Sequence, residues 1–97
     1  MSIVIVFFDE YLSMLKRTLH SIVNRTPRGL LQEIIMVNDN STLPELYEPL
    51  TNYCENNFGK LVRFREMKER SGMIKARLEG AHMANGEILV FFQAQIF

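Results

Sequence analysis

Runs of apolar residues and segments with helical spacing alternate along this sequence. Residues 2–8 and Glu33–Asn38 are nearly continuous apolar runs, rich in β-branched and aromatic side chains, which is typical of strands buried on both faces of a sheet. Residues 11–24 predict a helix with one buried face, because apolar side chains recur every three or four positions: Leu12, Leu15, Leu19, Ile22 and Val23. The breakers in residues 25–29 end this helix.

The second half of the chain repeats the alternation. Residues 43–59 have helical spacing, with Pro49 expected to split or kink the helix. Residues 61–65 mix apolar and basic side chains and predict a strand nearer a sheet edge, residues 73–84 predict a helix, and residues 87–92 predict a last strand. The order βαβαβαβ predicts an α/β fold with a mostly parallel four-stranded sheet and right-handed crossovers.

Charge and composition narrow the function classes that this fold could serve. Eleven basic and eleven acidic residues cancel, so no overall field favours nucleic acid or an anionic membrane. The apolar run at residues 2–8 is too short for a membrane span or a signal peptide, and none is expected in this chain. Cys54 is the single cysteine and is expected to be a small buried apolar residue. His20 and His82 fall on predicted helices and are expected to be surface or half-buried residues.

Candidate chemistry lies where the predicted strands end, since open parallel sheets bind ligands beyond the carboxyl ends of their strands. Neither a G-x-G-x-x-G turn nor a Walker lysine loop is present. Asp9 and Asp39 follow the first two strands and could cap helices or accept hydrogen bonds from a nucleobase or a ribose. Arg70 precedes a predicted helix start, where it could contact a phosphate or remain solvated.

Four separated stretches, at residues 3–10, 15–27, 30–37 and 72–81, together resemble one family. It is the polypeptide N-acetylgalactosaminyltransferases, which are GT-A glycosyltransferases of mucin-type O-glycosylation in the Golgi lumen. The resemblance implies a Rossmann-like GT-A half-domain over residues 1–97, of the glycosyltransferase 2-like type, with the acceptor half and the lectin domain outside this chain. It implies UDP or UDP-GalNAc as the ligand and a polypeptide acceptor in a longer form of the protein.

By resemblance, Asp39 contacts the uracil, Arg70 lies beside the nucleotide and Gly72 allows its close approach. The family's F-x-N-E segment falls on residues 7–10, with Asp9 in place of asparagine, and its V-D-D-x-S segment falls on residues 37–41, with Asn38 in place of the first aspartate. The implied nucleotide-binding residues are Phe7, Glu10, Asp39, Arg70 and Gly72.

The family's metal motif shows the largest departure. Its D-x-H segment, which binds Mn²⁺ on the UDP diphosphate, falls on residues 93–95, where Gln93 and Gln95 replace both ligands. Neutral amide oxygens are weak ligands for a divalent cation. We therefore expect that this chain does not bind the family's Mn²⁺, and we assign no catalytic residue. Metal-dependent transfer from a UDP-sugar is expected to be severely impaired.

Two functions remain open at this point. The first is a glycosyltransferase-like nucleotide-sugar-binding domain that is inactive as it stands, and the alternative is a non-catalytic interaction module of the same fold that no longer binds nucleotide. A receiver-like signalling domain shares the element order but requires a lysine at a late strand end, which this sequence lacks. Apolar residues near the carboxyl terminus predict association of the isolated chain through an exposed surface: Phe91, Phe92, Ile96 and Phe97.

Overall fold

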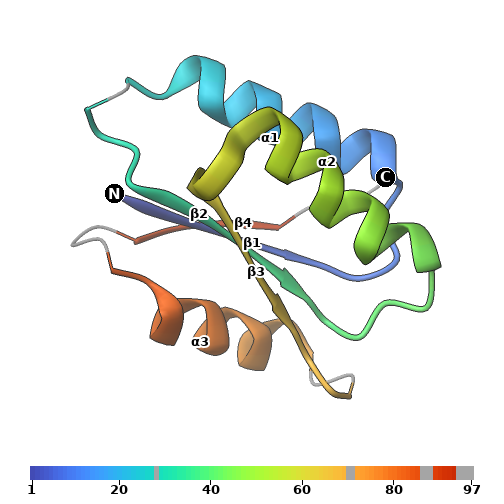
Figure 1. Cartoon of the computed structure of the whole chain (residues 1–97). Helices are drawn as coiled ribbons and strands as arrows, with labels where there is room; N and C mark the ends of the chain where they lie inside the picture. Colours follow the sequence, from blue (N-terminus) through green and yellow to red (C-terminus); the bar gives the residue numbers. More distant parts are fainter. Residues whose placement is uncertain (28, 70–71, 86–88, 94–97) are drawn as a thin grey trace.

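The computed structural model is a parallel α/β sheet with helices on both faces (Figure 1). It describes residues 1–27, 29–69, 72–85 and 89–93, and for Met73 and residues 89–93 it describes the backbone only. The strands are β1 (Ser2–Phe7), β2 (Glu33–Asn38), β3 (Val62–Glu66) and β4 (Leu89–Gln93). The α-helices are α1 (Leu12–Arg25), α2 (Glu48–Phe58) and α3 (Met73–Met83), and two short 3₁₀ helices are η1 (Pro44–Leu46) and η2 (Gly59–Leu61).

The sheet order is β3-β2-β1-β4, and each described pair of neighbours is parallel. In the register, Phe7 lies opposite Asn38 and Val6 lies opposite Gln93. The carboxyl ends of β1, β2 and β4 therefore meet at one edge of the sheet, called the carboxyl edge below. The predictions of a four-stranded parallel sheet and of a third strand at the sheet edge are confirmed.

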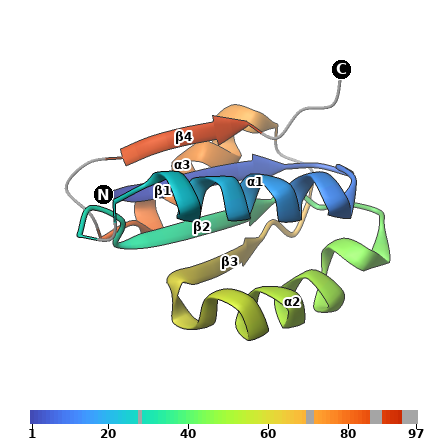
Figure 2. The ribbon, with the colours of Figure 1, turned by 90° about the horizontal axis from the view of Figure 1, so that it is seen from above.

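Two hydrophobic layers hold the sheet between its helices. α1 and α2 cover one face and α3 covers the other, as the two views show (Figures 1 and 2). Because side chains alternate along a strand, Ile3, Ile5 and Phe7 of β1 face the α1 and α2 side, while Val4 and Val6 face α3. Both faces of β1 and β2 are buried, which explains why these strands are continuous apolar runs.

The observed boundaries differ from the predicted ones at the second helix and at the third strand. Pro49 lies in the first turn of α2, so the predicted helix over residues 43–59 is divided into η1 and α2 as Pro49 suggested. Leu61 belongs to η2 and not to the strand. Cys54, on the buried face of α2, lies in the core as predicted, and burial raises the pKa of its thiol to about 11.

A buried carboxylate ties together the opposite, amino edge of the sheet. One Glu33 oxygen accepts hydrogen bonds from the Ser2 hydroxyl at 2.7 Å and the Asn85 backbone N–H at 2.5 Å, and the other accepts from Arg63 at 2.8 Å. The Arg63 guanidinium also donates to the Met83 carbonyl oxygen at 3.0 Å. Glu33 therefore joins the start of β1, β3 and the segment that follows α3.

Candidate functional site

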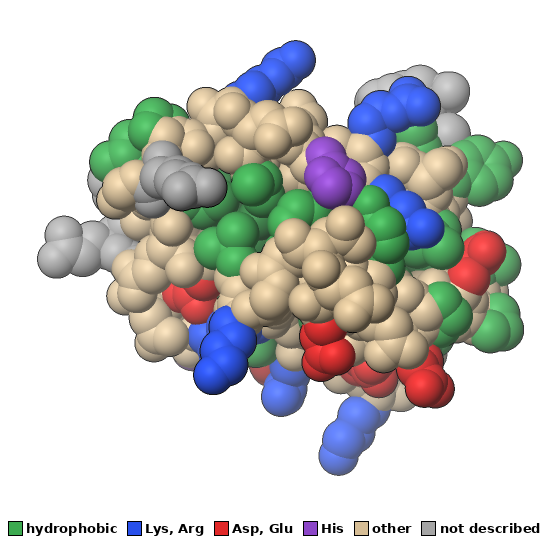
Figure 3. Space-filling model, turned by 45° about the horizontal axis from the view of Figure 1, so that its top comes forward, with side chains coloured by type: hydrophobic (Ala, Val, Ile, Leu, Met, Phe, Trp, Pro, Cys, Tyr) green, Lys and Arg blue, Asp and Glu red, His purple; other side chains and the backbone are tan. Residues whose placement is uncertain are grey.

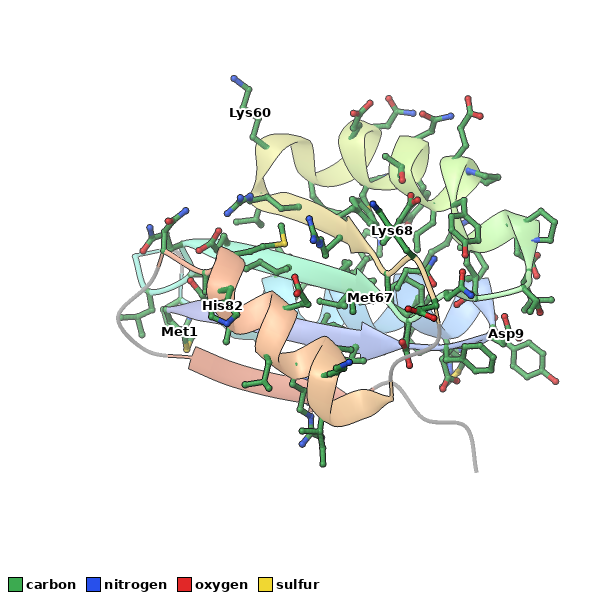
Figure 4. All side chains as sticks on the ribbon, turned by 90° about the horizontal axis from the view of Figure 1, so that it is seen from below. Met1, Asp9, Lys60, Met67, Lys68 and His82 are labelled. Carbon is green, nitrogen blue, oxygen red and sulfur yellow. The ribbon has the colours of Figure 1, made fainter. Side chains whose placement is uncertain are left out.

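The loops after β1, β2 and β3 meet at the carboxyl edge. The Asp39 N–H donates to the Phe7 carbonyl oxygen at 3.0 Å, and the Met67 N–H donates to the Asn38 carbonyl oxygen at 2.9 Å, so strand pairing continues into these loops. Asp9 lies beyond the end of β1, on the same side of the sheet as Met67 and Lys68, which follow β3 (Figure 4). This edge brings together the loops that carry Asp9 and Asp39.

Asp9 connects the loop after β1 to the loop after β2. One carboxylate oxygen accepts hydrogen bonds from the Thr42 N–H at 2.6 Å and the Leu43 N–H at 3.2 Å, and the other accepts from the Thr42 hydroxyl at 2.7 Å. The Asp9 N–H donates to the Ser41 hydroxyl oxygen at 3.0 Å. Asp9 therefore does not cap α1, the helix that follows it, where Tyr11 is the N-cap residue and no side chain caps the helix.

The side chain of Asn38 is used within its own loop. Its carbonyl oxygen accepts from the Ser41 N–H at 2.8 Å, and its amide nitrogen donates to the Leu46 carbonyl oxygen at 3.3 Å. An aspartate could not make the second hydrogen bond, because it lacks the donor. Asn38, which stands where the family has aspartate, therefore fits the local structure of this chain.

Tyr47 closes the loop from the side of α2. Its hydroxyl donates to the Ser41 carbonyl oxygen at 2.5 Å. Burial, with smaller contributions from the charges of Glu66 and Asp9, raises the pKa of Tyr47, so the hydroxyl stays protonated and remains a donor. Sequence reasoning did not find the roles of Ser41, Thr42 and Tyr47. The available signal was a loop rich in hydroxyl groups that follows a buried strand.

Asp39 is completely buried at the carboxyl edge, at 0 % exposure. Its carboxylate accepts a hydrogen bond from the Gly72 N–H at 3.2 Å, so it joins the loop after β2 to the start of α3. Gly72 has φ +88°, a conformation that side chains rarely adopt, which gives a structural reason for glycine there. A Cβ at Gly72 would meet no atom within 4 Å, so the space beside it is open.

Glu10 is the buried acid that the described residues leave without a partner. The residue is 8 % exposed, and within the described part of the chain no hydrogen bond or ion pair reaches its carboxylate. Burial raises the pKa of Glu10 above its ordinary value. The carboxylate oxygens of Glu10 are not fully buried, so a ligand that supplies N–H or O–H groups can reach them.

The other predicted site residues have different positions. Phe7 is fully buried in the core beneath α1 and α2. Arg70 and Gln95 lie outside the described residues, as do Ile96 and Phe97 of the predicted association surface, and the side chains of Phe91 and Phe92 are not described either. Gln93 is the last residue of β4, beside Val6 of β1, and only its backbone is described.

A divalent metal ion needs several ligand atoms close together. Among the described residues, no group of three or more His, Cys, Asp or Glu side chains is placed to hold one. The Asp9 carboxylate already accepts three hydrogen bonds from Thr42 and Leu43. At the end of β4, opposite Val6 of β1, the sequence has Gln93, and a neutral amide is a poor ligand for hard cations.

Both histidines lie away from the carboxyl loops. The imidazole Nε2 of His20, on α1, lies 2.5 Å from the Tyr53 hydroxyl and packs against Phe58. His82 is exposed near the end of α3, at the opposite end of that helix from Gly72 (Figure 4). Both positions agree with the prediction of surface or half-buried residues.

The surface carries no large patch of one charge on the face over α1 and α2. Basic and acidic side chains are interspersed there around an apolar band (Figure 3). Of the helices in the described ranges, none is long and apolar enough to cross a membrane.

Comparison with known proteins identifies the family. The family model described as glycosyl transferase family 2 matches residues 2–94 of this chain. The chain belongs to glycosyl transferase family 2. One protein of similar sequence is polypeptide N-acetylgalactosaminyltransferase 11 of Xenopus tropicalis, which is 46 % identical over 93 residues. These residues make up 96 % of this chain and 16 % of the relative. The chain thus spans about a sixth of the length of that family 2 relative.

Solved structures of similar sequence and shape agree with the family 2 assignment. A crystal structure of GalNAc-T7 with UDP, GalNAc and Mn²⁺ is 40 % identical, covers 97 % of this chain and 18 % of that protein, and superposes with a TM-score of 0.92. A mannosyltransferase of Pyrobaculum calidifontis in complex with GDP-Man and Mn²⁺ is 23 % identical and covers 96 % of this chain and 26 % of its own, with a TM-score of 0.82. The latter shows a common fold, and the expected Rossmann-like GT-A architecture is confirmed.

Proposed function

We propose that this chain is a glycosyltransferase-like domain that binds the UDP part of a UDP-sugar at the carboxyl edge of its sheet. The observation that carries the proposal is Glu10, an acid 8 % exposed and without a partner among the described residues, at the strand end where sheets of this type bind ligands. The relative solved with UDP supports the choice of nucleotide.

Each residue of the proposed site has a distinct part. Glu10 and Asp39 supply carboxylates that accept hydrogen bonds from a base N–H or from ribose hydroxyls. Asp39 at present bonds the Gly72 N–H at 3.2 Å, which places it at the junction with α3. Arg70 and Gly72 are proposed to lie beside the nucleotide, and Phe7 forms the core beneath it.

We propose that metal-dependent transfer is lost or severely impaired in this chain. In a relative solved with UDP and Mn²⁺, the metal accompanies the nucleotide. In this chain β4 ends at Gln93, and its amide is a weak metal ligand. No cluster of acidic side chains among the described residues could hold the metal instead. Binding of UDP would then rest on the nucleoside contacts and would not depend on a divalent cation.

The wider setting follows from the relatives and is also proposed. The donor would be UDP-GalNAc, and a longer form of the protein would present a polypeptide whose Ser or Thr hydroxyls receive the sugar. The proposed location is the Golgi lumen, by the resemblance to the polypeptide N-acetylgalactosaminyltransferases.

A second candidate function is an interaction module that keeps the fold and no longer binds nucleotide. The observation that favours it is Asp39, which is 0 % exposed and bonded to the Gly72 N–H. In that arrangement the carboxylate holds two loops together and offers no free surface to a base.

Calorimetric titration of the purified chain with UDP, with and without Mn²⁺, distinguishes these functions. The unaltered chain is compared with a Gln93→Asp, Gln95→His double variant. We expect UDP to bind the unaltered chain equally well with and without Mn²⁺, and to bind the variant more tightly when Mn²⁺ is present.

Two results would contradict the proposal. Failure of the folded, unaltered chain to bind UDP would favour the interaction module. Tighter binding of UDP by the unaltered chain when Mn²⁺ is added would show that the carboxyl edge holds a metal after all. Circular dichroism and thermal unfolding of both proteins establish that each is folded during the titration.

A further inference from the structure

The structure assigns to Asp9 the role of a positioning residue for the nucleotide site, which it serves without touching the ligand. This inference rests on the proposed function. The Asp9 carboxylate accepts hydrogen bonds from the Thr42 N–H, the Leu43 N–H and the Thr42 hydroxyl at 2.6, 3.2 and 2.7 Å. The loops that it joins are the ones that carry Glu10 and Asp39.

The backbone around Asp9 shows how firmly the two loops are set against each other. Asp9 has φ +47° and Asn40 has φ +56°, so each loop contains a non-glycine residue in the left-handed region. Such conformations persist where surrounding contacts determine them. At Asp9 the surrounding contacts include those of its own carboxylate and the bond from its N–H to the Ser41 hydroxyl at 3.0 Å.

Asp9 affects the positions of Glu10 and Asp39 because both acids are close in sequence to residues in its hydrogen bonds. Glu10 is the next residue on the chain, and its orientation depends on the backbone at Asp9. Asp39 lies two residues before Ser41 and is held by the same loop. Loss of the Asp9 carboxylate would release both acids together, although neither hydrogen-bonds to it in any described contact.

The chemistry of the three acceptor contacts defines a conservative replacement. The carbonyl oxygen of an asparagine at position 9 can accept from both backbone N–H groups, and its amide can donate to the Thr42 hydroxyl oxygen. An alanine can make none of these contacts. Asp9→Asn should therefore keep the loops in place, whereas Asp9→Ala should not.

The test compares Asp9→Ala and Asp9→Asn with Ser2→Ala, a control at the amino edge. Ser2→Ala removes one buried hydrogen bond, to Glu33 at 2.7 Å, far from the carboxyl loops. The dissociation constant for UDP is measured by calorimetry and Tm by thermal unfolding. The amide signals of Thr42 and Leu43 in ¹H–¹⁵N spectra without ligand report directly on the bonds to Asp9.

We expect Asp9→Ala to weaken UDP binding about tenfold, as misplacement of two contact residues would. Its Thr42 and Leu43 amide signals should shift. Asp9→Asn should retain most of the affinity, and Ser2→Ala should lower Tm without changing the dissociation constant.

The outcomes separate this inference from the function on which it rests. If the unaltered chain binds UDP and Asp9→Ala binds it equally well, the positioning role is wrong and the proposed function stands. If Ser2→Ala weakens binding as much as Asp9→Ala, the effect reports general stability and the role is again wrong. If the unaltered chain does not bind UDP, the proposed function fails, and the positioning role fails with it.

Discussion

At the scale of single residues, Glu10 of the proposed binding site is expected to lower the stability of the fold. Burial raises the pKa of its carboxyl above the usual value, so the charged form costs more free energy in the folded chain than in the unfolded chain. The charged form therefore lowers stability at pH values above the pKa in the unfolded chain, and this cost disappears as the pH falls through the raised folded pKa. Residues kept for binding often carry such a cost.

The substitution Glu10→Gln should separate stability from binding. We expect the variant to be more stable than the unaltered chain at pH 7, because the buried charge is gone. We also expect UDP binding to weaken about tenfold or more, since a hydrogen bond to a charged group is worth about 1.5–3 kcal/mol. Urea unfolding at pH 7 and calorimetric titration with UDP measure the two effects.

The pH dependence gives an independent check on Glu10. Affinity of the unaltered chain for UDP should fall as the pH is lowered through the raised pKa of Glu10, because protonation removes the acceptor. Glu10→Gln should lose this dependence, while Glu45→Gln, at an exposed position in η1, should keep it. A variant that is both less stable and unchanged in UDP affinity would contradict the role of Glu10.

At the scale of elements, Gly80 sets how closely α3 packs on the sheet. A Cβ at this position would lie 2.4 Å from one Val4 methyl group and 3.1 Å from a Val37 methyl group. Both valines are completely buried and β-branched, so their side chains have little freedom to move away. The close approach of helix and strand therefore requires glycine in the middle of α3.

The substitution Gly80→Ala should destabilise the chain in spite of the helix preference of alanine. Better propensity would add up to about 1 kcal/mol, but overpacking of a rigid core costs about 1–3 kcal/mol. We expect a net loss, measured as a lower midpoint of urea unfolding. Gly29→Ala is the matched control, since its Cβ would meet nothing within 4 Å, and its midpoint should hardly change. Equal midpoints for the two variants would count against close packing at Gly80.

The elements also show what sequence reasoning can and cannot predict. β1 and β2 were predictable because a strand buried on both faces must be apolar at every position, and α1 because its buried face leaves a regular spacing. The contacts of Asp9 were not, because its partners Thr42 and Leu43 are 33 and 34 residues away. Helix-capping rules consider only residues that are close in sequence. The bonds of Asp9 depend instead on the sheet, which places two loops distant in sequence next to each other.

At the scale of the whole molecule, the buried acids Glu10 and Glu33 at the two edges of the sheet differ in their hydrogen-bond partners. Glu10 at the carboxyl edge has no described partner, whereas Glu33 at the amino edge accepts bonds from Ser2, Asn85 and Arg63. Burial alone would raise the pKa of Glu33, but the hydrogen bonds from Asn85, Ser2 and Arg63, with the Arg63 charge, outweigh it and hold the pKa below its ordinary value. The amino edge therefore contributes stability, whereas Glu10 at the carboxyl edge is the acid that we propose for ligand binding.

Because the folded pKa of Glu33 is lowered, its contribution is present above the pKa of the unfolded chain and is lost as the pH falls through the folded value. We expect Glu33→Gln to cost about 1–3 kcal/mol at pH 7, since buried donors lose their acceptor. Most of this loss should come from the Ser2 and Asn85 donors, because solvent screens the Arg63 side chain, which is 41 % exposed. Urea unfolding from pH 7 down to pH 3 should show that the difference in stability between the variant and the unaltered chain becomes smaller in acid.

Glu55→Gln, at an exposed position on α2, is the control and should have the stability of the unaltered chain at every pH. A constant difference across the whole pH range would mean that ionisation of Glu33 does not join the strands at this edge.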